Sequence, residues 1–391
     1  MRLLLTHGYF LADDPKEREI MKPYPPLGLL YLSSHLKARG CAVEVYDSTF
    51  GSREELDRVL AGTPGVIGIY GNLMTRRSVL LIAAAGKTAG WRVVLGGPEP
   101  ANYAEEYLDR GADVIVAGEG ERAIEALLAC GMDRRGWCAI PGIIYRDAAG
   151  CVCRTGPASL IEDIDAQPWP DREAVDIGRY LSAWRARHGT GSISVITARG
   201  CPYHCNWCSH SVYGKTHRRR SPGGVADEVE FLLARYAPDM LWMADDVFTI
   251  HHGWLYEYAA EMVRRGIRIP FECITRADRV NERVAATLAR MGCFRVWIGS
   301  ESGSQRILDR MERGVTVEQV RRAVAWCKAE SIAVGMFLMW GYEGEELEDV
   351  EATVEHVRGC QPDACLTTVS YPIGGTPYYD LMQERLAHVG P

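Results

Sequence analysis

The sequence has neither a long apolar run nor a large excess of one charge. Its opening apolar stretch turns polar at Thr6, whereas a membrane-spanning helix needs roughly 20 apolar residues and a signal peptide a longer apolar core. Lys and Arg number 44 and Asp and Glu 51, a net charge of -7, which argues against nucleic acid or an anionic membrane as partner. We expect a cytoplasmic protein without a membrane span, with about two or three domains.

The sequence also lacks a G-x-G-x-x-G motif after its first apolar segment, which argues against a nicotinamide cofactor. Short apolar segments alternate with helix-length segments through residues 1–136. The expected strands are 2–6, 42–46, 66–70, 92–96 and 113–117. The helical segments between them end at Gly40, Gly62, Gly90 and Gly111, a common helix terminus. This α/β alternation predicts a Rossmann-like, doubly wound parallel sheet that binds ligands beyond the carboxyl ends of its strands.

Residues 137–190 interrupt the alternation with four prolines and a hairpin expected at 142–155, and we interpret them as a linker. A second alternating series occupies residues 191–391. Its expected strands are 193–197, 239–244, 270–275, 294–298, 333–339 and 364–371. Six such units in about 200 residues are too few for a closed eight-unit barrel of about 250. The series therefore predicts a partial (β/α)6 barrel, open on one side.

A second pair of closely spaced metal ligands, which structural zinc sites usually contain, is absent. Instead, Cys201-Pro-Tyr-His-Cys-Asn-Trp-Cys208 follows the first expected barrel strand. Three thiolates can hold an iron–sulfur cluster and leave one iron open to a substrate, and barrel enzymes carry their chemistry at this end of the strands. Zinc held by these cysteines with His204 or His210 is the alternative. The spacing favours the cluster.

The other cysteines are interpreted as structural. Six of them lie in apolar or helical segments, where a small cysteine side chain is expected to be buried in the core. They are Cys41, Cys130, Cys273, Cys293, Cys327 and Cys365. Cys151 and Cys153 follow a turn and are expected on a strand. No disulfide is expected in a chain of this size without an export signal.

The cysteine motif at the start of a partial barrel resembles the radical S-adenosylmethionine (radical SAM) superfamily. Later barrel loops extend the resemblance, with Asp245-Asp246, Thr275-Arg276, Gly299–Gly303 and Gly341–Glu345 at successive strand ends. With Lys22–Gly28, Gly96-Gly97-Pro98 and Gly118–Glu121, the N-terminal half is similar to the B12-binding domain that precedes the barrel in some members. The resemblance covers essentially the whole chain, except that many members continue beyond the barrel, and Tyr342 replaces a proline of the related pattern.

The resemblance implies a [4Fe-4S] cluster on Cys201, Cys205 and Cys208, with S-adenosylmethionine (SAM) on its open iron. By the same resemblance, the residues implied to contact SAM are Trp207, Asp245, Asp246, Arg276, Ser300 and Glu301. A low-potential electron donor such as flavodoxin or ferredoxin is implied as partner. No individual catalytic residue can be named from the sequence.

Cobalamin is the third implied cofactor. The D-x-H-x-x-G motif of proteins that place a histidine on cobalt is absent, but many radical SAM members lack it. In such members the loop after the third strand approaches the lower face of cobalt. Arg76 in this loop is expected to disfavour a protein ligand to cobalt rather than to provide one. The residues expected around cobalamin are His7, Asn72, Met74, Thr75, Gly96, Gly97 and Glu119.

These features predict a radical SAM enzyme that carries out cobalamin-dependent methyl transfer, or a related radical modification, on a small molecule. One alternative is a cobalamin-free enzyme that transfers the 3-amino-3-carboxypropyl group of SAM, as in arsinothricin biosynthesis. A second alternative is a non-catalytic, zinc-binding scaffold. The sequence does not identify the substrate.

Overall fold

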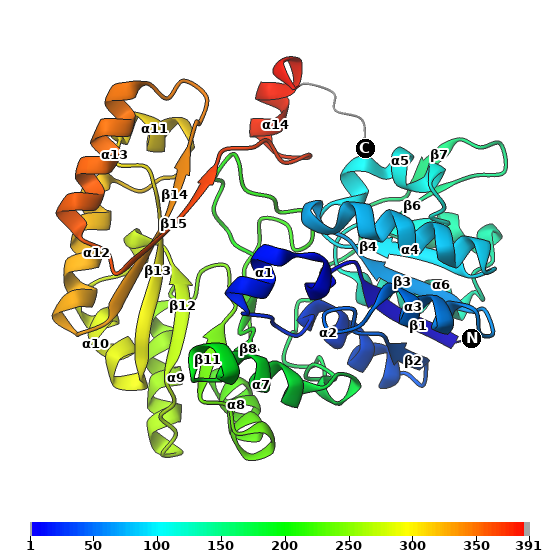
Figure 1. Ribbon diagram of the computed structural model, residues 1–391, viewed down its shortest axis with the longest axis horizontal. Helices are drawn as coiled ribbons and strands as arrows, with labels where there is room; N and C mark the ends of the chain where they lie inside the picture. Colours follow the sequence, from blue (N-terminus) through cyan, green and yellow to red (C-terminus); the bar gives the residue numbers. More distant parts are fainter. Residues whose placement is uncertain (1, 387–391) are drawn as a thin grey trace. The chain divides into compact units, whose positions relative to one another are not determined.

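The computed structural model describes residues 2–386, which divide into two compact units. The first unit comprises residues 2–189 together with 209–214, and the second comprises 190–208 and 215–386. Figure 1 shows each unit as a sheet with helices packed against it. The boundary at Gly189 lies near the predicted start of the barrel domain.

The first unit contains a seven-stranded sheet with the order β2-β1-β3-β4-β5-β6-β7. The strands are β1 (Arg2–His7), β2 (Ala42–Val45), β3 (Val66–Tyr70), β4 (Arg92–Gly96), β5 (Val114–Val116), β6 (Ile143–Arg146) and β7 (Val152–Arg154). The first five strands run parallel, whereas β6 and β7 are antiparallel. The strand order reverses at β1 and β3, where such sheets bind ligands.

Helices cover both faces of this sheet, because successive strand residues point to opposite sides. Leu3 and Leu5 pack in one core cluster with α2 (Leu27–Lys37) and α6 (Gly120–Ala129), and Leu4 packs in the other. The second cluster includes residues of α3 (Arg53–Leu60), α4 (Arg76–Thr88) and α5 (Ala104–Asp109). The doubly wound fold expected from the sequence is confirmed.

Residues 137–189 are part of the first unit rather than a free linker. The expected hairpin forms β6 and β7 and extends the sheet. Cys153 lies on β7 as expected, whereas Cys151 precedes the strand and is exposed. Helix α7 (Ile177–His188) then buries Ile177, Tyr180, Leu181 and Trp184. The spacing of these four residues is that of one helix face, a pattern that the sequence interpretation missed.

The second unit is a parallel six-stranded sheet with the order β15-β14-β13-β12-β11-β8. Its strands are β8 (Ser192–Val195), β11 (Met240–Met243), β12 (Phe271–Thr275), β13 (Cys293–Glu301), β14 (Ala333–Trp340) and β15 (Ala364–Val369). Each overlaps a segment predicted as a strand, and β13 continues three residues past its predicted end, through Glu301. Because β8 and β15 are at the two edges, the barrel is partial, as predicted.

Six helices follow the barrel strands and bury one apolar face each. They are α8 (Pro222–Tyr236), α9 (His252–Arg264), α10 (Glu282–Met291), α11 (Gln305–Arg310), α12 (Val317–Ala329) and α13 (Leu347–Cys360). In α8, for example, Val225, Val229 and Leu232 are completely buried. A short helix, α14 (Pro377–Met382), lies near the end of the described chain.

The cysteine predictions are only partly correct. Cys273, Cys293 and Cys327 are buried, whereas Cys41 and Cys130 are half-buried. Cys365 is exposed, contrary to prediction, because β15 is an edge strand and its residues from Cys365 to Val369 are all exposed. The described part of the chain contains no helix that is long and apolar enough to cross a membrane.

Candidate functional site

The three-cysteine loop lies beyond the carboxyl end of β8. A short strand, β9 (Ala198–Arg199), pairs with β10 (Arg218–Arg219), and the loop begins between them at Gly200, whose φ is 83°. Cys205 is buried, Cys201 is half-buried and Cys208 is exposed. The Cys208 N–H donates to the Cys205 carbonyl (3.2 Å). The loop therefore presents sulfur atoms at the end of the strands where barrel enzymes act.

Two buried arginines approach the sulfur of Cys205. Arg276 Nη1 lies 3.6 Å from it and Arg313 Nη1 lies 3.4 Å from it. The Arg276 guanidinium also stacks over the ring of Tyr203 within the same loop, 3.6 Å from its centroid. Arg313 was missed by the sequence interpretation, because it follows α11 rather than a strand end.

Crowding by surrounding protein atoms changes the pKa values of the other two thiols of the loop. It raises the pKa of Cys201, and it raises the pKa of Cys208 to about 12, with further contributions from Cys205, Asp246 and Cys201. Both thiols are therefore protonated at neutral pH, and metal binding must displace their protons. No three His, Cys, Asp or Glu side chains within residues 2–386 converge on one metal position.

The two aspartates after β11 differ in role. Asp245 is buried and accepts hydrogen bonds from the Thr197 N–H (2.6 Å) and the Ala198 N–H (3.1 Å). It also accepts one from Arg219 Nη2 (3.1 Å). These bonds fix β9 and β10 beneath the cysteine loop. Asp245 thus has a structural role that we did not predict.

Asp246 is exposed, and no hydrogen bond or ion pair of its carboxylate is found in residues 2–386. Crowding by protein atoms, followed by the charge of Asp245, raises its pKa. A carboxylate without a cationic partner beside the cysteine loop suits a cationic ligand. SAM binding at this loop therefore stays a prediction for Asp246.

A bulge separates the roles of Ser300 and Glu301. The register of β13 against β14 shifts between Gly299 and Glu301, and Glu301 has a φ of 61°. Ser300 Oγ lies 3.1 Å from Nε2 of the buried His356 on α13, so this hydroxyl forms a hydrogen bond toward the helix. Burial raises the pKa of Glu301, opposed by Arg313 at 3.8 Å. Bulges often re-aim a side chain at a functional site.

The remaining SAM candidates also lie in the second unit. Trp207 is partly buried against the apolar cluster of Met311, Met339 and Tyr342. Arg276 is 2% exposed, and its Nη2 donates to the Arg313 carbonyl (2.9 Å). Its guanidinium is therefore held by protein contacts on both terminal nitrogens. The structure therefore brings Asp246, Arg276 and Glu301 into the electrostatic environment of the three cysteines or of Arg313. Their contacts with SAM remain predictions.

In the first unit, His7 belongs to an internal hydrogen-bond network. Its Nδ1 accepts from the Tyr9 N–H (3.2 Å), and its Nε2 lies 3.1 Å from Asp47 Oδ1. The Tyr180 hydroxyl of α7 donates to the other Asp47 oxygen (2.7 Å). Burial alone would raise the pKa of Asp47. The hydrogen bonds to its carboxylate, of which that from His7 contributes most, hold the pKa below its usual value. With both ring nitrogens engaged, His7 has no nitrogen free for cobalt.

The loop after β3 is also held by local contacts. The Asn72 side chain accepts from the Thr75 N–H (3.0 Å) and caps a short helical turn. Met74 is 86% exposed at the tip of this turn. Arg76, expected to face cobalt, instead pairs with Glu99 and stacks over Tyr103 at 4.4 Å. Of these residues, only Met74 offers an unengaged side chain to a ligand.

Of the two predicted cobalamin glycines at the end of β4, only Gly97 has a steric reason to be glycine. Gly97 has a φ of 111°, and a Cβ there would lie 2.3 Å from the carbonyl oxygen of Gly71. Only glycine allows this close approach of two strand-end loops. A Cβ at Gly96 would make only an ordinary contact with Val116.

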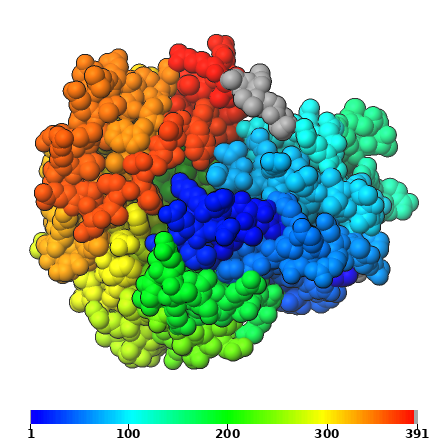
Figure 2. Space-filling view, in the orientation of Figure 1, coloured from blue at the N-terminus to red at the C-terminus, as the bar shows by residue number. Residues whose placement is uncertain are grey.

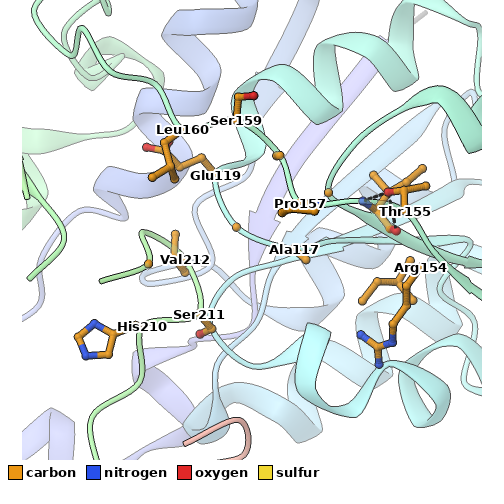
Figure 3. A pocket seen from close by; sticks show the side chains of 16 residues that line it. Ala117, Glu119, Arg154, Thr155, Pro157, Ser159, Leu160, His210, Ser211 and Val212 are labelled. Carbon is orange, nitrogen blue, oxygen red and sulfur yellow. Dashed lines mark hydrogen bonds between the residues drawn. The ribbon is translucent and has the colours of Figure 1, made fainter. Parts of the chain in front are cut away.

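Glu119 borders a cavity of ≈ 390 Å³ within the first unit (Figure 3). The buried Glu119 carboxylate accepts from the Ile161 N–H (2.8 Å), which fixes the chain segment after β7 along the cavity. Residues 210–212 form the facing wall in Figure 3. Gly118, next to Glu119, has a φ of 90°. The other predicted cobalamin residues do not line this cavity.

The residues present fit the implied cofactors in different ways. For a cluster, the fit is chemical, since three thiols lie on one loop and two guanidiniums are close to one sulfur. For cobalamin, the fit is partial, since a cavity of ≈ 390 Å³ has the size of a site for a small ligand and could receive only part of so large a molecule. Both features lie at the carboxyl ends of parallel strands.

Comparisons with known proteins agree with this arrangement. A family model of the radical SAM superfamily matches residues 195–357, and one of the B12 binding domain matches residues 18–128. An uncharacterized methyltransferase of Pyrococcus horikoshii is 28% identical over 91% of this chain and 78% of its own length. The anaerobic magnesium-protoporphyrin IX monomethyl ester cyclase of Rubrivivax gelatinosus is 26% identical over 98% of this chain and 70% of its own.

A solved structure has the same fold over both units. It is the radical SAM methyltransferase TsrM of Kitasatospora setae with cobalamin and a [4Fe-4S] cluster, with a TM-score of 0.79 and 21% identity. The match covers 99% of this chain and 75% of that one. The fold assigned from the sequence is therefore confirmed.

Proposed function

Because the chain belongs to the radical SAM proteins that carry a B12-binding domain, we propose that it is a cobalamin-dependent methyltransferase of a small molecule. One observation carries the proposal. The same chain holds a three-thiol loop at the mouth of its barrel and a cavity at the strand ends of a B12-binding domain. The methyltransferases among its relatives support methyl transfer over the other radical modifications.

The cofactors supply the reactive chemistry when bound: the cluster delivers an electron to SAM, and cobalamin carries the methyl group. The chain's residues bind and position them. Cys201, Cys205 and Cys208 would hold three irons of the cluster, and the negative charge of those thiolates would be balanced in part by Arg276 and Arg313. Asp246 would accept the ammonium group of SAM, and Glu301 a ribose hydroxyl.

The donor of the electron is expected to be a flavodoxin or a ferredoxin, since a cluster that reduces a sulfonium needs a low-potential partner. A reducing compartment suits this chemistry. All thirteen cysteines are free, and free thiols are typical of the cytoplasm. We therefore propose that the protein acts there.

Cobalamin binding is tested by titration of the cluster-free protein with hydroxocobalamin, followed by its visible spectrum. We expect Val212→Trp, which places a large ring at the wall facing Glu119, to weaken binding at least about tenfold. Val212→Ala is the matched control and should bind as the wild type does. Unaltered affinity of the tryptophan variant would mean that the cavity does not receive the cofactor.

A further inference from the structure

A second concave surface of the first unit lies apart from the Glu119 cavity. It is a groove of ≈ 540 Å³, and its apolar floor includes Leu11, Met21 and Phe50. One wall comes from the short helix α1 (Pro15–Ile20) through Arg18, and the other comes from α7. Figure 2 shows the dark-blue N-terminal residues, which include α1, at the surface of the drawn face. None of the residues assigned above to SAM, cobalamin or the cluster lines it.

The sequence of α7 explains the shape of the groove. Ile177, Tyr180, Leu181 and Trp184 form its buried face, whereas residues 179, 182, 183, 186 and 187 line the groove. The middle of this second face is Ser182, Ala183 and Ala186, whose small side chains leave a hollow. Arg179 and Arg187 stand at its two ends, about 12 Å apart along the helix axis.

The groove carries three positive charges and no acidic side chain in its lining. Arg18, Arg179 and Arg187 are all exposed, and no ion pair to any of them is found within residues 2–386. Arg179 stacks over Phe50 at 4.7 Å from its ring centroid, which orients its guanidinium along the floor. Arg187 donates through Nε to the Glu19 carbonyl (3.1 Å), so its terminal nitrogens stay available.

The two walls are fixed to each other by α7 side chains. Trp184 Nε1 donates to the Pro23 carbonyl (2.7 Å), and His188 Nε2 donates to the Ile20 carbonyl (3.0 Å) at the end of α1. At the other end of α7, Tyr180 bonds to Asp47 (2.7 Å). The arginines therefore surround a preformed hollow, which lowers the entropic cost of ligand binding.

We propose that this groove binds a small organic anion that carries phosphate groups. Guanidinium groups bind phosphate oxygens in pairs of charge-assisted hydrogen bonds, and uncompensated arginines on three sides can engage more than one such group. The floor of Leu11, Met21 and Phe50 suits the apolar body of an organic ligand, and the volume is in the range of small-molecule sites. The groove is independent of the proposed methyl transfer.

The test is calorimetric titration of the protein, reconstituted with cluster and cobalamin, with inorganic pyrophosphate at constant ionic strength. We expect saturable binding that Arg179→Gln and Arg18→Gln, from opposite walls, each weaken at least about tenfold. Arg185→Gln is the matched control, because Arg185 is on the same helix and exposed but does not line the groove. Thermal melts of the three variants establish that each is folded.

The outcomes separate a specific site from general attraction. Loss of affinity in Arg179→Gln and Arg18→Gln, with wild-type affinity in Arg185→Gln, supports the site. Absence of saturable binding to the wild type overturns the proposal. Equal weakening by all three substitutions overturns it too, because that result reports only the overall charge of the surface.

Discussion

At the scale of single residues, Cys205 differs from the two other cysteines of its loop. It is the buried one and receives both guanidiniums, whereas Cys201 and Cys208 have raised pKa values. The two guanidiniums anchor Cys205 within the loop. The contact with Arg313, which lies 108 residues away in the sequence, defines that anchor.

Replacement of Cys205 by alanine is expected to abolish cluster assembly. Two remaining thiolates cannot hold the three irons that the loop would bind. Iron and acid-labile sulfide, measured after anaerobic reconstitution, should fall at least about tenfold in Cys205→Ala. Cys365→Ala is the control, because Cys365 is exposed on an edge strand, and it should retain the wild-type content. A full cluster in Cys205→Ala would refute the assignment.

The lowered pKa of His356 predicts that the free energy of unfolding depends on pH. Burial lowers its pKa to about 4, whereas an unfolded histidine titrates near about 6.5. The imidazole is therefore neutral in the fold, and its contribution to stability is complete above about pH 6.5 and is lost as the pH falls toward 4. Between pH 7 and pH 5, about 2 kcal/mol should be lost at this residue.

Urea unfolding at pH 7 and pH 5 tests this, with the wild type compared against His356→Gln. The glutamine retains a hydrogen-bonding group for Ser300 but does not titrate. We expect the variant to show a smaller difference between the two pH values than the wild type. The same acid sensitivity in both proteins would show that His356 does not titrate in this range.

The predicted roles of single residues rest on different signals. The spacing of the three cysteines is local and can be read from the sequence, whereas Asp246 was singled out by the family resemblance at a strand end, and both assignments stay predictions. Ser300 and Asp245 were assigned to SAM from the same kind of signal, but their side chains bond to His356 and to Thr197. The direction of a side chain at a strand end depends on bulges and on distant partners, which local sequence does not encode.

At the scale of elements, the close packing of β14 on β13 depends on one glycine. A Cβ at Gly335 would lie 2.2 Å from the ring of Trp297. That ring is fixed, because it stacks on Phe337 with a centroid distance of 5.3 Å and donates through Nε1 to Glu272 (2.9 Å). The sheet of the second unit therefore has no room for a side chain at this position.

Gly335→Ala should destabilise the protein by about 1–3 kcal/mol, the usual cost of overpacking. Gly359→Ala is the control, since a Cβ there meets no atom within 4 Å in helix α13 and alanine favours a helix by up to about 1 kcal/mol. Thermal unfolding of both variants measures the difference. A melting temperature of Gly335→Ala equal to that of the wild type would contradict this description of the packing.

Elements with a strong pattern were predicted well. Every expected strand of both parallel sheets exists, because buried parallel strands form continuous apolar runs. Residues 137–190 were harder. Their prolines indicated a linker, yet β6 pairs with β5, β7 pairs with β6, and α7 anchors the segment through Tyr180 and Trp184. Pairing with a distant strand overrides the local composition.

At the scale of the whole molecule, two folds with different cofactors are encoded in one chain. Residues 209–214, which directly follow the cysteine loop, belong to the first unit and form a wall of the Glu119 cavity. The chain that carries the sulfur ligands thus continues into the proposed cobalamin site. The order of the domains was predictable from the sequence. The placement of residues 209–214 in the first unit was not, because this short segment has no sequence pattern of its own.

The most direct measurement identifies the nucleosides that the reconstituted protein makes from SAM under anaerobic, reducing conditions. The account predicts 5′-deoxyadenosine, together with S-adenosylhomocysteine that forms only when cobalamin is loaded. Methylthioadenosine as the main product would contradict methyl transfer and indicate transfer of the 3-amino-3-carboxypropyl group. A colourless, redox-inactive metal with none of these nucleosides would contradict the radical SAM chemistry itself.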